Sequence, residues 1–203
     1  MKIVIIDYGL GNLRSIEKAL QYVGAEVEIS KEVHVIDKAD ALVLPGVGAF
    51  RDAMMHFSTL EHVVKNAVDE GKPLLGICLG MQMLASESEE GGLHKGIDII
   101  PGRVTRFPPS ELKVPHMGWN SLIIKKHIPF LKEIKNGSFV YFVHSFHVST
   151  DKKYEAALCD YGLQFPSIIT SEAGNVVGTQ FHPEKSGAIG LQMLRNFVEN
   201  YGH

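Results

Sequence analysis

Short runs of consecutive apolar residues constrain the fold of this chain more than any other feature. Three such runs occupy positions 3–6, 41–44 and 74–77. A strand that is apolar at every position fits a sheet that helices cover on both faces, which is the usual setting of parallel strands. Apolar residues recur at helical spacing over 13–23, and again from 49 to about 70 in two pieces. This alternation predicts an α/β fold with a mainly parallel central sheet.

The second half of the chain has a different pattern, which predicts shorter strands separated by turns such as Asn136-Gly137. A short helix is expected near 129–134, and apolar spacing predicts an amphipathic helix over 187–201. No Ser/Pro-rich linker separates the halves, so we expect a single domain over residues 1–203 whose parallel sheet continues into an added antiparallel portion. The strands expected in this half are 101–107, 118–124, 138–148, 155–160, 167–170 and 176–180.

Composition and charge exclude several classes of protein. The 203 residues are 45% hydrophobic, enough to bury a sizeable core, and the formal net charge of -3 does not favour nucleic-acid binding. The first apolar run meets an acidic residue after four positions, and no run approaches the length of a membrane span. We therefore expect a cytoplasmic protein with no membrane association, in a reducing setting where a free thiol persists.

Cofactor and metal motifs are incomplete in this chain. Gly9 and Gly11 begin a pattern that resembles a dinucleotide-binding loop, but position 14 holds Arg14 instead of the third glycine. Cys78 and Cys159 are far apart and form no C-x-x-C pair, and no two histidines have the H-x-x-x-H spacing. We expect no cofactor, no metal and no disulfide.

The run at 74–77 leads into Gly76-Ile77-Cys78-Leu79-Gly80, which has the spacing of a nucleophile elbow with cysteine as the nucleophile. Glycines two positions before and after the nucleophile remove Cβ atoms that would clash at a tight strand-to-helix turn. A helix over 81–85 would direct its N-terminal dipole at the sulfur and favour the thiolate. The alternative is a buried cysteine that acts only as a small hydrophobe.

A base for this nucleophile follows the strand expected at 176–180. His182 and Glu184 lie two positions apart, with Pro183 restricting the backbone between them. If that strand lies beside the strand that carries Cys78, His182 can reach the thiol and Glu184 can orient the imidazole. An exposed His-Pro-Glu turn is the alternative.

Backbone donors for an oxyanion are available at two places. Positions 45–48, Pro-Gly-Val-Gly, follow a buried strand, and a glycine-rich strand end can present N–H groups without side-chain obstruction. The N–H of Leu79, directly after the elbow cysteine, is the second candidate donor. A plain turn before a helix explains positions 45–48 equally well.

The strings at 76–82 and 181–184 together resemble the triad-type, class I glutamine amidotransferases. Those at 7–12, 44–48 and 115–120, with Tyr-Phe-Val-His-Ser at 141–145, narrow the resemblance to the glutaminase subunits of imidazole glycerol phosphate synthase. The resemblance covers essentially the whole chain and implies a flavodoxin-like, three-layer fold.

The resemblance also implies a role for each motif. Cys78 would attack the carboxamide carbon of L-glutamine to give a γ-glutamyl thioester, His182 would protonate the departing ammonia and then activate water, and Glu184 would orient the imidazole. Val47, Gly48 and Leu79 would form the oxyanion site, with a strand that rearranges in this family. The residues implied to hold glutamine are Gly48, Gln82, Glu90, His144 and Ser145.

A partner is implied as well. In this family the ammonia passes to a (β/α)₈ cyclase, HisF, in a heterodimer that converts PRFAR, a ribulosyl phosphate intermediate of histidine synthesis, into imidazole glycerol phosphate and AICAR, an aminoimidazole carboxamide ribotide. The docking face implied for this chain comprises Asp7, Tyr8, Gly9, Asn12, Met117, Trp119, Asn120 and Lys185.

Two other functions remain compatible with the sequence. A glutaminase of the same class could feed a different synthase, for example one that aminates a sugar or a cofactor precursor. A non-catalytic binding domain on the same layout could keep Cys78 as a redox sensor, although the His182 and Glu184 pair would then have no purpose.

Overall fold

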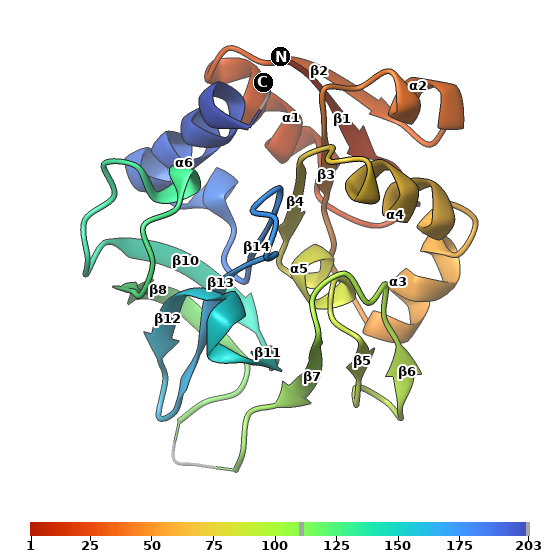
Figure 1. Ribbon diagram of the computed structural model, residues 1–203. Helices are drawn as coiled ribbons and strands as arrows, with labels where there is room; N and C mark the ends of the chain where they lie inside the picture. The colour runs from red at the N-terminus through yellow and green to blue at the C-terminus, as the bar shows by residue number, and fades with distance from the viewer. Residues whose placement is uncertain (110–111, 202–203) are drawn as a thin grey trace.

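An eight-stranded sheet forms the centre of the protein in the computed structural model, which describes residues 1–109 and 112–201 (Figure 1). Five neighbouring strands run parallel and the remaining three continue the sheet in antiparallel fashion, which confirms the mixed α/β fold. The strands in spatial order are β2 (Glu26–Ser30), β1 (Lys2–Ile6), β3 (Ala41–Leu44), β4 (Leu74–Ile77), β14 (Val176–Thr179), β13 (Gln164–Thr170), β12 (Glu155–Asp160) and β9 (Ile123–Ile124).

Helices cover both faces of this sheet and make three layers (Figure 1). Alternate residues of β1 show the arrangement, because Ile3 and Ile5 pack into one hydrophobic cluster while Val4 and Ile6 pack into another. The first cluster includes buried residues of α1 (Leu13–Tyr22) and α6 (Gly187–Asn200). The second includes those of α2 (Val33–Asp37), α3 (Phe50–Phe57), α4 (Glu61–Asp69) and α5 (Leu79–Met83).

Two smaller sheets lie beside the central one and contain the other strands of the second half, together with two short strands that precede them in the chain. Strands β8 (His116–Ser121) and β10 (Phe139–His144) form one pair. The other sheet has the order β11 (Phe146–Thr150), β7 (Gly102–Arg106), β5 (Glu87–Ser88) and β6 (His94–Lys95).

The strand expected over 138–148 is therefore wrong as one element, because the chain changes sheet at Ser145. Val140 and Phe142, before the break, pack into the first hydrophobic cluster. Val148, after it, packs into the second. Positions 140, 142 and 148 would all lie on one face of a straight strand, so a straight strand cannot send Val148 to a different cluster from Val140 and Phe142. The break places residues 143–146 at the boundary between the two small sheets.

The structure also differs from the sequence-based expectation in several short elements. The five-residue helix α2 between β2 and β3 is too short for its apolar spacing to be recognised. Residues 129–134 contain only the 3₁₀ turn η1 (Pro129–Leu131), and α5 starts at Leu79 rather than at position 81. Two further 3₁₀ turns are η2 (Lys152–Tyr154) and η3 (Pro183–Lys185).

The turn at Cys78 packs tightly against the end of β3. A Cβ atom on Gly80 would lie 1.9 Å from the carbonyl oxygen of Leu44. This oxygen belongs to the backbone of β3, so it cannot move away by a side-chain rotation. We expect Gly80→Ala to lower the free energy of unfolding by about 3 kcal/mol or more, measured by urea denaturation. Gly24→Ala is the control, because Gly24 has a positive φ of 97° but open space, so it incurs only left-handed strain of about 1–2 kcal/mol. Equal losses in the two variants would contradict the steric argument.

Candidate active site

Cys78 lies between β4, which ends at Ile77, and α5, which begins at Leu79. Its backbone has φ of +56° and ψ of −109°, a strained conformation for a residue with a side chain. The Cys78 N–H donates to the carbonyl of Thr179 at 2.7 Å, which ties the turn to β14. The elbow expected from the glycine spacing is therefore present, and the sulfur stands at the end of a short helix.

His182 reaches this turn because β14 pairs in parallel with β4, with Thr179 opposite Ile77. The segment after β14 therefore emerges at the same edge of the sheet as Cys78. His182 Nδ1 lies 2.8 Å from Glu184 Oε1, and the two side chains are only 3% and 0% exposed. The His-Pro-Glu turn is thus buried rather than exposed.

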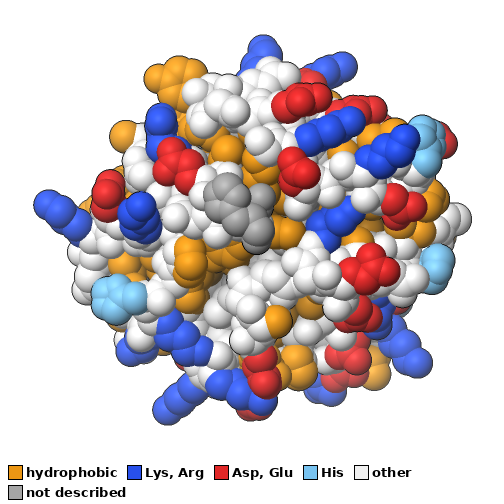
Figure 2. Space-filling view, turned by 45° about the horizontal axis from the view of Figure 1, so that its top comes forward, with side chains coloured by type: hydrophobic (Ala, Val, Ile, Leu, Met, Phe, Trp, Pro, Cys, Tyr) orange, Lys and Arg blue, Asp and Glu red, His pale blue; other side chains and the backbone are white. Residues whose placement is uncertain are grey.

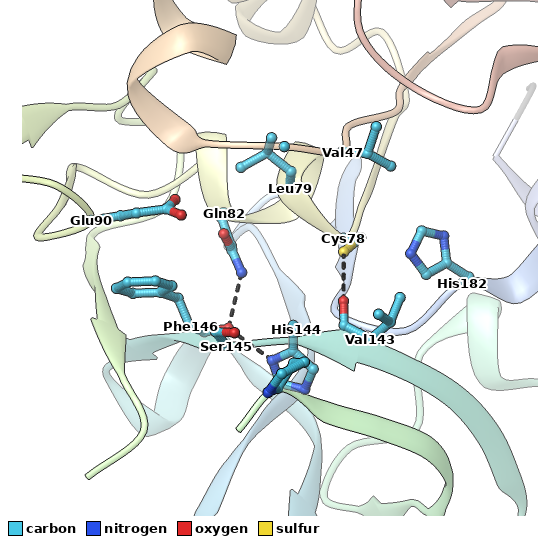
Figure 3. A pocket seen from close by; sticks show the side chains of 12 residues that line it. Val47, Cys78, Leu79, Gln82, Glu90, Val143, His144, Ser145, Phe146 and His182 are labelled. Carbon is cyan, nitrogen blue, oxygen red and sulfur yellow. Dashed lines mark hydrogen bonds between the residues drawn. The ribbon is translucent and has the colours of Figure 1, made fainter. Parts of the chain in front are cut away.

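Opposing effects act on the pKa of His182. Burial disfavours the imidazolium, but hydrogen bonds with Cys78 and Glu184 and the charges of both groups outweigh it and raise the pKa from 6.5 to about 9. The proton on Nδ1 faces the Glu184 carboxylate, so the other ring nitrogen is left for the sulfur. Figure 3 shows Cys78 and His182 at the same end of the pocket.

A pocket of about 330 Å³ opens in front of the sulfur (Figure 3). Nearly all the residues expected for the chemistry or for glutamine line it, whereas Glu184 lies behind His182. The side chains that the sequence did not single out are Pro115, Val143 and Phe146. The complete lining is Val47, Gly48, Cys78, Leu79, Gln82, Glu90, Pro115, Val143, His144, Ser145, Phe146 and His182.

Glu90 enters the pocket from the loop after β5. Its Oε2 accepts a hydrogen bond of 2.9 Å from the backbone N–H of Phe50, the first residue of α3. The positive end of the α3 dipole therefore holds a carboxylate at the pocket wall. This places a fixed negative charge where a substrate ammonium group would be attracted.

The segment 45–48 borders the pocket opposite the small sheets. Tyr8 donates its hydroxyl proton to the carbonyl of Pro45 at 2.6 Å, which anchors the start of the segment. Gly48 has a positive φ of 100° and Val47 is exposed. Leu79, by contrast, is buried at the first turn of α5.

Two buried histidines continue the pocket wall into the interior. His144 Nδ1 lies 2.8 Å from the carbonyl of Phe146, which can only accept, so this nitrogen carries a proton. His144 Nε2 is then the acceptor for His116 Nδ1 at 3.0 Å, and His116 Nε2 accepts from Asn120 at 3.3 Å. Burial lowers the pKa of His116 to about 4 and that of His144 to about 3, so both rings stay neutral near pH 7.

The residues expected on a partner face do not all present side chains to solvent. Met117 and Trp119 on β8 are 62% and 55% exposed, and the indole of Trp119 reaches the start of α6 near Gly187. Tyr8 is buried against Phe57, so its side chain lies beneath that face.

The remaining residues of the expected partner face behave differently from one another. Asp7 accepts from the N–H of Gly9, Asn12 and Lys185 are exposed, and Asn120 donates to the carbonyl of Asp160. Met117 and Trp119 are the large apolar side chains of this expected face that are exposed to solvent.

Some features of the described residues bear on other kinds of function. No helix among residues 1–109 and 112–201 is both long and apolar enough to span a membrane. Within the same residues, no cluster of three His, Cys, Asp or Glu side chains is placed to hold a metal ion. On the face drawn in Figure 2, acidic and basic side chains are interspersed, so that face carries no concentrated charge of one sign.

Solved structures with this fold include proteins named as glutamine amidotransferases. A crystal structure titled glutamine amidotransferase superposes with a TM-score of 0.76 at 20% identity, covering 99% of both chains. A glutamine amidotransferase from Thermotoga maritima gives a TM-score of 0.66 at 18% identity, over 99% of this chain and 82% of that one. At these identities the likeness shows the fold.

Comparison of the sequence with known proteins identifies the family to which the chain belongs. The model of the family "Glutamine amidotransferase class-I" matches residues 4–201. The imidazole glycerol phosphate synthase subunit HisH of Methanosarcina acetivorans is 58% identical over 98% of both chains. The protein of the same name from Archaeoglobus fulgidus is 50% identical over 97% of both. The chain therefore belongs to the class-I glutamine amidotransferase family and, within it, to the HisH subunits of imidazole glycerol phosphate synthase.

Proposed function

We propose that this protein hydrolyses L-glutamine to glutamate and ammonia through a Cys78–His182–Glu184 triad, as one domain over residues 1–203. One observation carries the proposal. His182, held by Glu184 at 2.8 Å, and Cys78, at the strained turn, follow neighbouring parallel strands, and both line the same pocket. Nucleophile, base and orienting carboxylate stand in the order that acyl transfer to a thiol requires.

The first half of the reaction forms a thioester. The Cys78 thiolate attacks the carboxamide carbon, and the carbonyl oxygen gains the negative charge that the N–H of Leu79 and the backbone at 47–48 would stabilise. His182 as imidazolium donates a proton to the amide nitrogen, the C–N bond breaks, and ammonia leaves. Its pKa, raised to about 9, keeps the imidazolium available at neutral pH.

The second half regenerates the enzyme. Neutral His182 accepts a proton from water as the water oxygen attacks the thioester carbon. The C–S bond breaks, glutamate leaves, and the sulfur and imidazole return to the thiolate and imidazolium pair. Glu184 stabilises the imidazolium in both halves because its carboxylate faces Nδ1 throughout.

Glutamine itself would be held by the rest of the pocket lining. Glu90, at the N-terminus of α3, suits the α-ammonium group, and the backbone of Gly48 and His144 and the side chains of Gln82 and Ser145 suit the polar ends of the substrate. The pocket volume of about 330 Å³ fits a ligand of this size.

The ammonia produced here needs a second active site, because free ammonia near neutral pH is largely protonated and ammonium is not a nucleophile. The proposal therefore includes a heterodimer with a (β/α)₈ cyclase, HisF, which would use the ammonia to make imidazole glycerol phosphate and AICAR from PRFAR in histidine synthesis. The names of the related proteins, which are subunits of a synthase, support this partner. A cytoplasmic setting suits the free thiols of Cys78 and Cys159.

A coupled assay tests the partner. Glutamate release is measured with the purified cyclase and its ribulosyl phosphate ligand, and with each omitted. We expect release to rise when both are present. Recovery of a different synthase by affinity capture would instead support a glutaminase that serves another amination pathway.

Trp119→Ala is expected to weaken binding of the cyclase by about 30-fold, because a half-exposed tryptophan beside Met117 is a typical interface anchor. Isothermal titration calorimetry measures the change. Tyr22→Ala is the control, since Tyr22 is 73% exposed at the far end of α1 from Asn12. Unchanged affinity for Trp119→Ala would remove Trp119 from the partner face.

A further inference from the structure

Gln180 is a fully buried polar residue that the triad mechanism does not use. It directly follows β14 and precedes Phe181, two positions before His182. Its Nε2 donates to Cys78 Sγ at 3.8 Å, within the range of a hydrogen bond to sulfur. The structure thus places an amide N–H group within hydrogen-bonding distance of the nucleophile. Buried polar groups in proteins are almost always hydrogen-bonded, so this contact is expected to be a genuine hydrogen bond.

The orientation of this amide follows from one carbonyl group, that of Phe146. A carbonyl oxygen can only accept a hydrogen bond, so the Gln82 amide must direct its NH₂ group at the Phe146 carbonyl. Gln82 Nε2 lies 3.0 Å from that oxygen. The same NH₂ lies 3.1 Å from Gln180 and must meet an acceptor there, which is Gln180 Oε1. The NH₂ group of Gln180 is therefore the end of the amide that faces Cys78 Sγ, and it donates the hydrogen bond.

The Phe146 carbonyl is itself held in place. It also accepts from His144 Nδ1 at 2.8 Å, so two donors from opposite walls of the pocket meet on one oxygen. Phe146 is the first residue of β11, in register with Arg106 of β7, which fixes the direction of the carbonyl. The donor that faces Cys78 is therefore positioned before any substrate binds.

A contact of the sulfur with a backbone carbonyl explains why a donor in addition to His182 is needed. Cys78 Sγ donates its proton toward the carbonyl of Val143 at 3.9 Å, and that carbonyl oxygen can only oppose a negative charge on the sulfur (Figure 3). When the thiol loses its proton, the donor from Gln180 remains and becomes a charge-assisted hydrogen bond, which is stronger than a neutral one.

We infer that Gln180 is a further catalytic residue, whose amide N–H holds Cys78 Sγ and stabilises the thiolate, with Gln82 orienting it from the Phe146 carbonyl. Gln82 thereby serves two purposes, as pocket lining and as the support of Gln180. The inference rests on the proposed glutamine hydrolysis for its catalytic meaning, but the contact with sulfur can be tested without glutamine.

Gln180→Met is the decisive variant, because methionine has similar length and volume and no donor. The rate of alkylation of Cys78 by iodoacetamide at pH 7, followed by mass spectrometry of the Cys78 peptide, is expected to fall about tenfold. In the coupled assay kcat should fall by a similar factor, while KM for glutamine stays within about twofold. This split separates an effect on the sulfur from a loss of substrate binding.

Thr179→Val is the matched control. Thr179 is the neighbouring buried residue, and its hydroxyl donates to the carbonyl of Phe181 instead of to the sulfur. This variant loses a buried hydrogen bond on the same segment, so it is expected to lower stability while alkylation keeps the wild-type rate. Slowing of Thr179→Val as large as that of Gln180→Met would overturn the inference.

Gln180→Glu gives an independent measurement if Gln180→Met does not fold. The carboxyl group can still accept from Gln82 Nε2 but turns an acceptor toward the sulfur, so alkylation should slow at least as much as in Gln180→Met. Wild-type alkylation in either folded variant would overturn the inference. If the wild-type protein shows no glutaminase activity in the complex, the proposed function is overturned instead. The alkylation rates do not depend on glutamine, so they still test the hydrogen bond between Gln180 and Cys78.

Discussion

Cys78→Ser is expected to lower glutamine hydrolysis in the complex by a factor on the order of 10⁴ or more. The thiolate is the only group at the strained turn that can form the acyl intermediate, and a serine hydroxyl ionises far less readily than a thiol. Glutamate release measured with the cyclase and its ligand reports the loss. The folded state of the variant should be unaffected, because oxygen replaces sulfur without adding volume.

Cys159→Ser is the matched control for this variant. Cys159 is fully buried in β12, burial raises the pKa of its thiol to about 12, and the thiol donates to the carbonyl of Asp160. A serine can make that bond, so we expect activity within about twofold of wild type. Full activity in Cys78→Ser, or equal losses in both variants, would exclude the thioester mechanism.

Glu184→Gln is expected to lower kcat by about 10²- to 10⁴-fold with a much smaller change in KM. The amide has the shape of the carboxylate but not its charge, and it can present NH₂ to the nitrogen that must carry a proton. Imidazolium is then less stable during departure of ammonia. Steady-state kinetics in the complex give both parameters, and Glu172→Gln, at an exposed surface ion pair with Lys153, is the control.

The pH dependence of stability provides a second measurement on Glu184→Gln. The folded state raises the pKa of His182 from 6.5 to about 9, so protonated His182 favours folding. This contribution, on the order of 3 kcal/mol, is fully present below pH 6.5 and is lost as the pH rises through 9. Because the variant lacks part of it, its deficit in unfolding free energy should be largest near pH 6 and smaller near pH 9.5. A deficit that is constant with pH would show that Glu184 acts only through packing.

Local chemistry in the sequence was sufficient to predict the elements that carry the nucleophile. Continuous apolar runs identified β1, β3 and β4, and the glycines around Cys78 identified the turn, because a tight turn imposes steric demands on its immediate neighbours. These predictions depend on contacts between residues close in sequence. They are the kind that an amino-acid pattern records directly.

Features that depend on packing between distant segments were missed. The break at Ser145 was not visible in residues 138–148, because strand propensity continues through it and only the two separate hydrophobic clusters require the change of sheet. Gln180 was overlooked for a related reason. Its donor direction is set by Gln82 and the carbonyl of Phe146, and a backbone carbonyl leaves no signal in a sequence.

By itself, the sequence determined the parallel α/β core, the strained cysteine turn and the residue types available for a thiol triad, since each follows from local sterics or from the chemistry of single side chains. Only the tertiary structure decided that β14 lies beside β4, which brings His182 and Glu184 to Cys78. The same folding sets Cys78 and Glu184 against His182, and their hydrogen bonds and charges outweigh burial and raise the pKa of His182. It also closes the pocket with the small sheets. The physical reason is that strand order and burial depend on the whole packed core, whereas residue patterns report only on their neighbours.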